Sequence, residues 1–445
     1  MPPVDENPSE TVQRRARRHV QSLIQRNRRD TGLQSRWADP PPIRSVGIVG
    51  AGMMGTAFAA VHVRRNVPVV LTDADQTALG EAPGRIAAEL TDEVPLGEAR
   101  DLVGRMVRPT VDPGHLRQCD LIVESIVEAP PAKQQLYARL QPVLAEGAVL
   151  ASNTSTIPIG RLAAGLTDAG RFCGMHFFHP VRQRPLVEIV RGPQTGDRTI
   201  AAAVAHAKAI DKMPIVVDDG PGFLVNRLLL PYLGEALELL LEGAEPEAIE
   251  RAATDFGMAK GPFRLADEIG LDTVLQSGLV LRDAFPERIA ASPLLIALVK
   301  RKRLGRKSGA GFFSYGDPAV PGPARPSEEL DQIIAQWARP PQDHTARSIT
   351  ARLVLPMVLE ATRILAEGKV RDPRDIDLAV LFGLGFPAAR GGLLWWADTV
   401  GAAQIVEILR PLEPLGPRCQ PTPMLQDLAR HGGSFYRSLQ PHGPG

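Results

Sequence analysis

Between Ile43 and about Asp219, short apolar runs rich in β-branched residues alternate with longer stretches in which apolar residues recur at helical spacing. The apolar runs are SVGIVG, PVVLTD, DLIVES, AVLAS and IPIVVDD. This alternation is typical of a mostly parallel sheet that is covered by helices on both faces. Residues 43–219 are therefore predicted to form one α/β domain.

The pattern changes after Gly220-Pro221-Gly222, where strand-like runs nearly disappear. Apolar residues then recur every three to four positions, as they do on one face of a long helix. Prolines are concentrated between residues 316 and 345, which predicts a linker that contains one short helix over residues 328–337. Helical patterns resume after this linker.

Two of the predicted helices resemble each other in sequence. NRLLLPYLGEALELLLEG (226–243) and ARLVLPMVLEATRILAEG (351–368) agree at 9 of 18 positions without a gap. Such an internal repeat indicates two copies of one helical module. The predicted order is an α/β domain (43–219), a first helical domain (220–316), a Pro-rich linker (317–345) and a second helical domain (346–445).

The first 42 residues are polar and rich in arginine. We predict that they form a helical or disordered segment that is mostly solvated. A transit peptide is the alternative, but Asp5, Glu6 and Glu10 differ from the acid-poor composition of such peptides.

Composition narrows the classes of protein that fit the chain. Its 445 residues carry a formal net charge of +1, which argues against a dedicated nucleic-acid-binding protein. The three cysteines are far apart in the sequence, so they predict neither a disulfide framework nor a metal site, and they favour a cytoplasmic protein. No apolar run approaches the roughly 18 residues that a membrane span requires.

A G-x-G-x-x-G pattern begins at Gly50, between a predicted strand (46–49) and a predicted helix (56–64). In this context the pattern indicates a dinucleotide-binding turn. Gly50 would allow the tight turn, Gly52 would let the backbone approach a pyrophosphate, and Gly55 would let the helix pack on the strand. A glycine-rich turn of some other α/β fold is the alternative.

Asp73 ends the second predicted strand, 18 residues after the last glycine of the pattern. An acidic residue there accepts hydrogen bonds from the adenosine ribose and repels a 2′-phosphate, which favours NAD over NADP. The sequence therefore predicts a Rossmann-type domain that binds NAD. The residues assigned to the cofactor from this turn and strand are Gly50, Gly52, Met53, Met54, Gly55 and Asp73.

Oxidation by NAD requires a general base beside the group that is oxidised. His176 lies in the apolar stretch FCGMHFFHP, and Glu188 lies in the next strand-like run, LVEIVRG. Strand alternation places Glu188 on the face that carries Leu186 and Val190, where a carboxylate needs a partner. His176 is a candidate for that partner, although a histidine in an apolar strand is more often a hydrogen-bonded core residue.

Several segments resemble the 3-hydroxyacyl-CoA dehydrogenase family in the order expected of it. They are VGIVGAGMMG, DLIVESIVEAPPAKQQLY, SNTSTIPIGRLAAGLTDAGRFCGMHFFHPVRQRPLVEIVRG, DDGPGFLVNRLL and GPFRLADEIGLD. The resemblance as a whole covers nearly everything from Ile43 to Tyr315. The basic run from Lys300 to Lys307 matches the closing LGRKxGxGFF motif of the family, and we interpret it as structural. The resemblance implies NAD-dependent oxidation of (S)-3-hydroxyacyl-CoA to 3-oxoacyl-CoA.

The same resemblance implies roles for individual residues. His176 matches the general base of the family, and Glu188 matches the carboxylate that orients its ring. Ser155 and Asn226 match positions that hydrogen-bond the C3 oxygen of the substrate. The second copy of the repeat has Ala351 in place of Asn226, so we expect the first copy alone to serve chemistry.

Further residues are assigned to the cofactor site by the resemblance. Glu128 and Lys133 match residues near the nicotinamide ribose, and Asn153 of the SNTS motif is placed with them. A surface charge pair is the alternative for Glu128 and Lys133. No metal ion is expected.

Residues 375–401 are similar to the last domain of the large multifunctional fatty-acid β-oxidation proteins. The chain thus resembles their dehydrogenase portion without the enoyl-CoA hydratase domain, which 42 polar residues cannot encode. We expect the second module to make, within one chain, the contact that two subunits make in single-function relatives. The resemblance implies an acyl-CoA substrate, such a pseudo-dimer, and room for a separate hydratase or thiolase partner.

The chain departs from the family pattern at two places. His179 stands where the HFFNP motif has asparagine, and the stretch between Asp73 and Glu124 is shorter than the usual lysine-rich helical insertion and has no lysine. The candidates for contacts with the CoA phosphates are therefore Arg85, Arg100 and Arg105.

Two other functions fit the sequence. One is a dehydrogenase of another small hydroxyacid, such as a sugar acid, on the same scaffold. The other is a non-catalytic subunit that binds NAD or acyl-CoA and docks a hydratase or thiolase through the second helical module.

Overall fold

The computed structural model describes residues 8–33, 40, 42–317, 325 and 328–436. The chain divides into two compact units. We call residues 24–223 the sheet unit, and residues 1–23 together with 224–445 the helical unit. Parts of the predicted N-terminal segment (1–7, 34–39, 41) and of the predicted linker (318–324, 326–327) lie outside the described residues.

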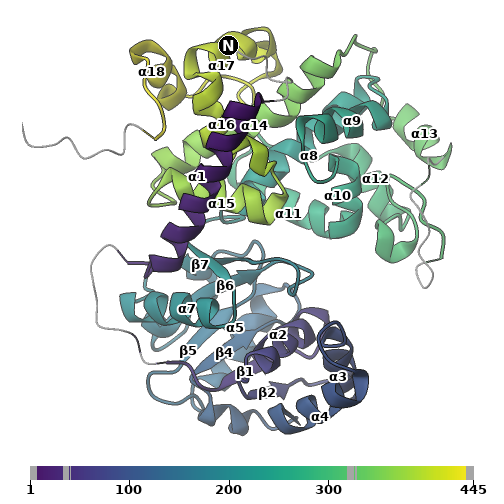
Figure 1. Cartoon of the computed structure of the whole chain (residues 1–445). Helices are drawn as coiled ribbons and strands as arrows, with labels where there is room; N and C mark the ends of the chain where they lie inside the picture. The colour runs from purple at the N-terminus through teal and green to yellow at the C-terminus, as the bar shows by residue number, and fades with distance from the viewer. Residues whose placement is uncertain (1–7, 34–39, 41, 318–324, 326–327, 437–445) are drawn as a thin grey trace, which may run out of the picture. The chain divides into compact units, whose positions relative to one another are not determined.

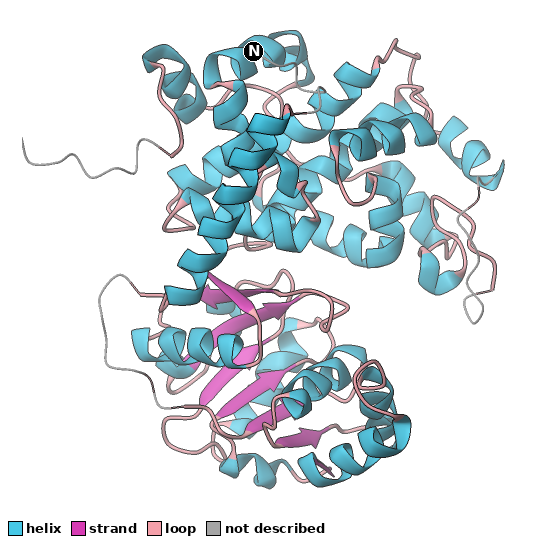
Figure 2. Ribbon diagram, viewed as in Figure 1, coloured by secondary structure: helices cyan, strands magenta, loops and turns pink. Residues whose placement is uncertain are grey.

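The sheet unit contains one eight-stranded sheet with the order β3-β2-β1-β4-β5-β6-β7-β8. Its strands are drawn in magenta in Figure 2. The strands are β1 (Val46–Val49), β2 (Val69–Thr72), β3 (Val107–Thr110), β4 (Leu121–Glu124), β5 (Val149–Ser152), β6 (Phe172–Phe177), β7 (Leu186–Arg191) and β8 (Met213–Asp218). Neighbouring strands are parallel except β6 and β7, which are antiparallel. The strand order reverses beside β1, between β2 and β4, and ligands bind at the carboxyl ends of strands at such a point.

Helices pack against both faces of this sheet (Figure 1). They are α2 (Met53–Arg64), α3 (Gln76–Glu89), α4 (Leu96–Met106), α5 (Pro130–Leu140), α6 (Ile159–Leu162) and α7 (Asp197–Ala209). Apolar residues of α2, α3, α4 and α7 share one core with Ile48, Val123 and Met175 of the strands. The other face carries α5, whose Tyr137 ring lies 5.2 Å from that of Phe172.

Strand alternation places a set of polar side chains on the face that carries α5. Glu124, Ser152, His176 and Glu188 all belong to this set, and each is buried. The first three stand at or near the carboxyl ends of β4, β5 and β6. The edge of the sheet at which the glycine-rich turn follows β1 therefore also carries these groups.

One strand of the sheet was not predicted. β3 contains Arg108 and Pro109, and both are exposed. Proline cannot donate to a neighbouring strand, so it is tolerated at the edge of a sheet, where β3 lies. An edge strand with this composition lacks the apolar signal that identified the inner strands.

The core of the sheet unit contains a pair of histidines that the sequence did not single out. His62 of α2 and His206 of α7 approach with their Nε2 atoms 2.9 Å apart, and His62 Nδ1 donates to the carbonyl of Phe58 at 2.7 Å. Burial lowers the pKa of His62 to about 4 and that of His206 to about 3. Both rings are therefore neutral in the folded protein near neutral pH.

This pair makes the stability of the sheet unit depend on pH. The unfolded chain takes up protons at His62 and His206 below their ordinary pKa of 6.5, whereas the folded chain does not until about pH 4. Each histidine should therefore lower stability by about 2 kcal/mol between about pH 7 and pH 5, and the two together by about 4 kcal/mol, measured by urea unfolding. His206→Phe should reduce this dependence, and an unchanged dependence would contradict the explanation.

The helical unit consists of two modules that follow each other in the chain (Figure 1). The first contains α8 (Val225–Leu241), α9 (Pro246–Phe256), α10 (Pro262–Ile269), α11 (Leu271–Ala284) and α12 (Pro293–Lys300). The second contains α14 (Ala346–Ala366), α15 (Pro373–Ala379), α16 (Leu393–Val400), α17 (Ala402–Leu409) and α18 (Pro423–His431). The linker helix is α13 (Glu328–Ala335), close to its predicted bounds, and no helix among the described residues is long and apolar enough to cross a bilayer.

The repeated helices α8 and α14 pack against each other through reciprocal ion pairs. Arg227 Nε donates to Glu360 at 2.8 Å, and Arg352 Nε, at the equivalent position of the second copy, donates to Glu235 at 2.7 Å. These four charged side chains are about 2% exposed. The arginines and glutamates that both copies share therefore pack the two helices together as buried ion pairs.

A second pair of equivalent carboxylates supports the interpretation of a repeat. Glu250 accepts the backbone N–H of Phe263 at the start of α10, at 2.8 Å. Asp377 accepts the backbone N–H of Leu394 at the start of α16, at 2.7 Å. In each module a carboxylate thus satisfies N–H groups that a helix leaves unpaired at its first turn.

The arginine-rich N-terminal segment is not simply solvated, which corrects part of the prediction. The segment forms a helix, α1 (Glu10–Arg29), which was one of the two predicted structures. Three of its residues, Ala16, Leu23 and Asn27, are buried and not solvated. In the helical unit His19 Nε2 lies 3.1 Å from the hydroxyl of Tyr436, and in the sheet unit Asn27 donates to the carbonyl of Pro214 at 2.6 Å. The buried positions recur at helical spacing, but the many arginines between them obscured this signal.

Candidate functional site

The three glycines of the turn after β1 occupy different environments. Gly50 has φ +111°, and a Cβ there would lie 2.4 Å from the carbonyl oxygen of Ser125. A Cβ at Gly55 would lie 1.8 Å from the carbonyl oxygen of Gly50, so α2 packs directly on the turn. A Cβ at Gly52 would meet no atom within 4 Å, which leaves space beside the first turn of α2.

The N-terminus of α2 faces this space with unpaired donors. Its N-cap is Gly52, and no side chain in the described part of the chain caps the helix. The backbone N–H groups of the first turn and the helix dipole favour an anion at this position. A pyrophosphate group fits both the space and the donors. Met53 at the first position of α2 is 61% exposed, and Met54 is half-buried.

Asp73 lies at the end of β2 and closes the turn. Its Oδ2 accepts the backbone N–H of Ala51 at 2.6 Å, and its Oδ1 accepts that of Asp75 at 2.9 Å. The carboxylate is half-buried, so part of it remains accessible beside the glycine-rich turn. Arg85 supports the same turn, because it donates to the carbonyls of Ala51 and Ala78 at 2.9 and 2.8 Å.

These contacts distinguish the three arginines, Arg85, Arg100 and Arg105, that the sequence made candidates for contacts with the CoA phosphates. Arg85 is used to hold the glycine-rich turn. Arg100 and Arg105 lie on α4 and are exposed. Arg100 and Arg105 therefore remain candidates for contacts with the CoA phosphates.

A buried carboxylate that the sequence analysis missed organises the next part of the edge. Glu124, at the end of β4, is 0% exposed and accepts from Lys133 Nζ and the Tyr137 hydroxyl at 2.6 Å, and from the Ser152 hydroxyl at 2.8 Å. Burial and the charge of Glu124 raise the pKa of Tyr137 well above its ordinary value, so its hydroxyl remains a donor. The available signal was the acidic residue that ends an otherwise apolar strand.

Lys133 and Glu128 do not form the surface pair considered as their alternative. Lys133 is 1% exposed and lies 3.3 Å from Glu128 in addition to its bond with Glu124. Glu128 Oε1 also accepts the Thr154 hydroxyl at 2.6 Å and the backbone N–H of Ser155 at 2.9 Å. Glu128 thereby fixes the SNTS segment at the carboxyl end of β5.

Asn153 and Ser155 lie in this fixed segment. The Asn153 side chain accepts the backbone N–H of Phe177 at 3.0 Å, which ties the segment to the carboxyl end of β6. Ser155 is half-buried. The structure thus brings Glu128, Lys133, Asn153 and Ser155 together in one part of the sheet edge.

His176 and Glu188 face each other across β6 and β7. They are direct partners in the antiparallel register, and His176 Nδ1 lies 2.6 Å from Glu188 Oε2. His176 is 4% exposed and Glu188 0%. The predicted partnership is therefore confirmed as a contact, and it orients the ring with Nδ1–H donating to the carboxylate, which leaves the Nε2 lone pair to accept a proton.

Two phenylalanine rings pack beside the His176 imidazole. Phe178 and Phe223 have ring centroids 4.5 and 5.8 Å from that of His176. Apolar walls strengthen the hydrogen bond between the imidazole and the carboxylate because they exclude water from it. His179, by contrast, is exposed just beyond β6. A buried histidine that a carboxylate orients, at the same sheet edge as the glycine-rich turn, can act as a general base for a group held there.

Asn226 belongs to the helical unit, at the second residue of α8. It is half-buried. Its neighbour Arg227 is used in the ion pair with Glu360, and Ala351 stands at the equivalent position of α14.

Two protein-family models match most of the chain. The model of the NAD-binding domain of 3-hydroxyacyl-CoA dehydrogenase matches residues 45–220, and the model of the C-terminal domain matches residues 222–315 and 349–436. The chain is 25% identical to a solved 3-hydroxybutyryl-CoA dehydrogenase from Escherichia coli, with 88% of this chain and 99% of that chain covered at a TM-score of 0.77.

Two further solved structures are similar to the chain. The dehydrogenase part of multifunctional enzyme 1 from C. elegans is 27% identical, with 95% of this chain and 98% of that chain covered at a TM-score of 0.66. An (S)-3-hydroxybutyryl-CoA dehydrogenase from Ralstonia eutropha is 36% identical, with 62% of this chain and 100% of that chain covered at a TM-score of 0.58. The chain therefore belongs to the 3-hydroxyacyl-CoA dehydrogenase family, and it is an NAD-dependent dehydrogenase.

Proposed function

We propose that the chain oxidises (S)-3-hydroxyacyl-CoA to 3-oxoacyl-CoA in fatty-acid β-oxidation. The observation that carries this proposal is the buried pair of His176 and Glu188 at the carboxyl edge that also holds the glycine-rich turn. A secondary alcohol loses a proton and a hydride when it becomes a ketone, so a base must stand beside the hydride acceptor. The two solved hydroxybutyryl-CoA dehydrogenases described above support a CoA thioester as the substrate.

In the proposed mechanism, His176 Nε2 takes the proton of the 3-hydroxyl group, and Glu188 stabilises the imidazolium that forms. Bound NAD supplies the acceptor for the hydride that leaves C3. Ser155 and Asn226 are assigned the hydrogen bonds to the C3 oxygen, which holds most negative charge as the proton leaves. The assignment of Asn226 is based on its motif and on its replacement by Ala351 in the second copy.

The cofactor is assigned to residues that surround the glycine-rich turn and the adjacent strand ends. The first turn of α2 would hold the pyrophosphate, and Asp73 the adenosine ribose. Glu128, Lys133 and Asn153 would position the nicotinamide ribose, because their mutual contacts fix the ends of β4, β5 and β6.

The two helical modules are proposed to form a pseudo-dimer within one chain. The reciprocal ion pairs between α8 and α14 support this proposal, because residue i of one copy contacts residue j of the other, and the reverse. Reciprocity of this kind is what a two-fold interface produces between identical subunits.

The function is tested by NADH oxidation with a panel of 3-oxoacyl-CoAs, and with 3-oxo acids that lack CoA. We expect turnover with acetoacetyl-CoA and little with the free acids. Turnover with a free 3-oxo acid alone would favour the dehydrogenase of another small hydroxyacid. Binding of NADH without turnover on any of these compounds would favour a non-catalytic subunit.

A further inference from the structure

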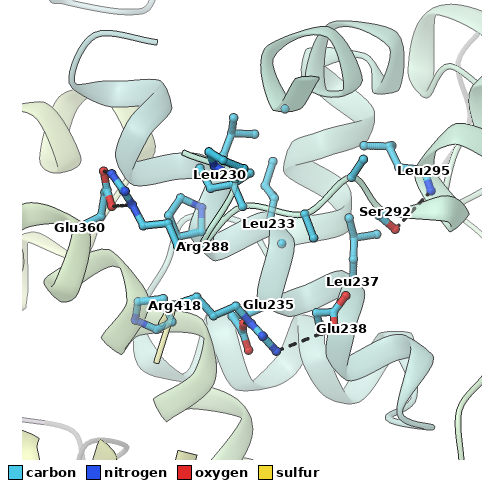
Figure 3. A pocket seen from close by; sticks show the side chains of 18 of the residues that line it. Leu230, Leu233, Glu235, Leu237, Glu238, Arg288, Ser292, Leu295, Glu360 and Arg418 are labelled. Atoms are coloured by element: carbon cyan, nitrogen blue, oxygen red, sulfur yellow. Dashed lines mark hydrogen bonds and ion pairs between the residues drawn. The ribbon is translucent and has the colours of Figure 1, made fainter. Parts of the chain in front are cut away.

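The helical unit contains a cavity of about 180 Å³ that the proposed mechanism does not use (Figure 3). It lies between α8, α11, the segment 286–292, α12 and α14. Much of its lining is apolar, and Leu230, Leu233 and Leu237 form one wall along α8. A cavity with this lining suits an uncharged, apolar ligand.

The cavity begins one helical turn from Asn226. Leu230, Leu233 and Leu237 follow Asn226 at intervals of four, seven and eleven residues, so all four lie on one face of α8. At about 1.5 Å per residue, the wall starts about 6 Å from Asn226 along the helix and continues for about 10 Å. A chain attached to the carbon that Asn226 is proposed to recognise could therefore extend directly into the cavity.

Two helical glycines keep the cavity open. Gly234 on α8 and Gly278 on α11 both line it, and a Cβ at either position would meet no atom within 4 Å. Glycine is the least favourable residue in a helix interior after proline, and packing does not require it at these two positions. A ligand that occupies the space beside Gly234 and Gly278 would explain why these two positions carry no side chain.

The charged side chains around the cavity take part in ion pairs. Arg288 Nε lies 3.0 Å from Glu360, and Arg418 Nε lies 2.6 Å from Glu235. Figure 3 draws the pair of Arg288 with Glu360 and a longer contact of Arg418 with Glu238. These guanidinium groups are therefore already neutralised, which argues against a phosphate as the occupant. The hydrocarbon chain of the thioester is the part of the substrate that fits.

We propose that this cavity binds the distal carbon chain of the acyl-CoA substrate, and that Gly234 and Gly278 set the chain length that it accepts. The proposal rests on the proposed function. It assigns to the first helical module a role in specificity beyond the role of Asn226.

The test compares acetoacetyl-CoA with 3-oxodecanoyl-CoA in the full-length protein. Each methylene that enters the cavity should raise kcat/KM about fourfold in the wild type, as expected from about 0.8 kcal/mol per buried methylene. Gly278→Leu fills the cavity, so it should lower kcat/KM for 3-oxodecanoyl-CoA by about 10- to 100-fold and change that for acetoacetyl-CoA less than about twofold. Gly234→Leu, which enters the cavity from α8, should have the same selective effect.

Two controls separate filling of the cavity from other effects. Gly278→Ala raises helix propensity with little filling, and Gln276→Leu adds the same side chain to the exposed face of α11; both should keep the wild-type profile. A wild-type chain-length profile in Gly278→Leu and in Gly234→Leu, with activity on acetoacetyl-CoA retained, would overturn the proposal. Absence of wild-type turnover on every thioester would instead overturn the proposed function.

Discussion

Replacement of His176 by glutamine is expected to lower kcat for acetoacetyl-CoA reduction by about 10²- to 10⁴-fold. Glutamine can still form hydrogen bonds in the site, but it cannot exchange a proton with the C3 oxygen. The glycine-rich turn and Asp73 are unaffected, so the Kd for NADH, measured by fluorescence titration, should change less than about threefold. The loss should therefore appear in kcat and not in binding of the cofactor.

The role of Glu188 can be separated from that of His176 by a double-mutant cycle. If the pair acts as one unit, Glu188→Gln lowers kcat on its own but adds little to His176→Gln. His431→Gln is a matched control, because this histidine is 71% exposed on α18 and should leave kcat unchanged. A His176→Gln enzyme that keeps wild-type kcat would show that the base lies elsewhere.

Replacement of Arg352 by methionine is expected to destabilise the helical unit by about 3–5 kcal/mol. Arg352 pairs with Glu235 at 2.7 Å and with Glu242, and all three side chains are nearly inaccessible to water. Methionine fills a similar volume but leaves two buried carboxylates with less compensation. The measurement is the free energy of unfolding in urea, followed by circular dichroism.

Two further variants test whether the loss of stability comes from the buried ion pair. Arg410→Met removes an ion pair with Glu407 in which both side chains are more than half exposed, so it should change stability by less than about 0.5 kcal/mol. Arg352→Met combined with Glu242→Met should recover part of the loss, since one unpaired charge is removed. A change below about 1 kcal/mol for Arg352→Met would contradict the view that these pairs hold the two modules together.

The sequence predicted those parts of the fold in which one local pattern decides the structure. The inner strands were found because buried parallel strands are continuous apolar runs, and the turn at Gly50 was found because its glycines stand between a strand and a helix. β3 was missed because an edge strand with Arg108 and Pro109 carries no such pattern. The burial of Ala16 and Leu23 was missed because arginines dominate the composition of α1.

The site was predictable only in part, for a related reason. The contact between His176 and Glu188 could be inferred, because a carboxylate on an apolar strand face requires a partner nearby. Glu124 was missed, because its side-chain donors come from α5 (Lys133 and Tyr137) and from β5 (Ser152), which only the tertiary structure brings beside it. The shared arginines of the repeat were noticed as shared, but their reciprocal pairing with Glu235 and Glu360 depends on how α8 and α14 pack.

The central claim is that the chain moves a hydride between NAD and C3 of an acyl-CoA thioester. It is tested most directly with NADH deuterated at both C4 positions and acetoacetyl-CoA, followed by mass spectrometry of the 3-hydroxybutyryl-CoA formed. One deuterium at C3 of the product, lost together with turnover in His176→Gln, is the predicted result. Wild-type protein that binds this NADH but yields no deuterated thioester would contradict the claim.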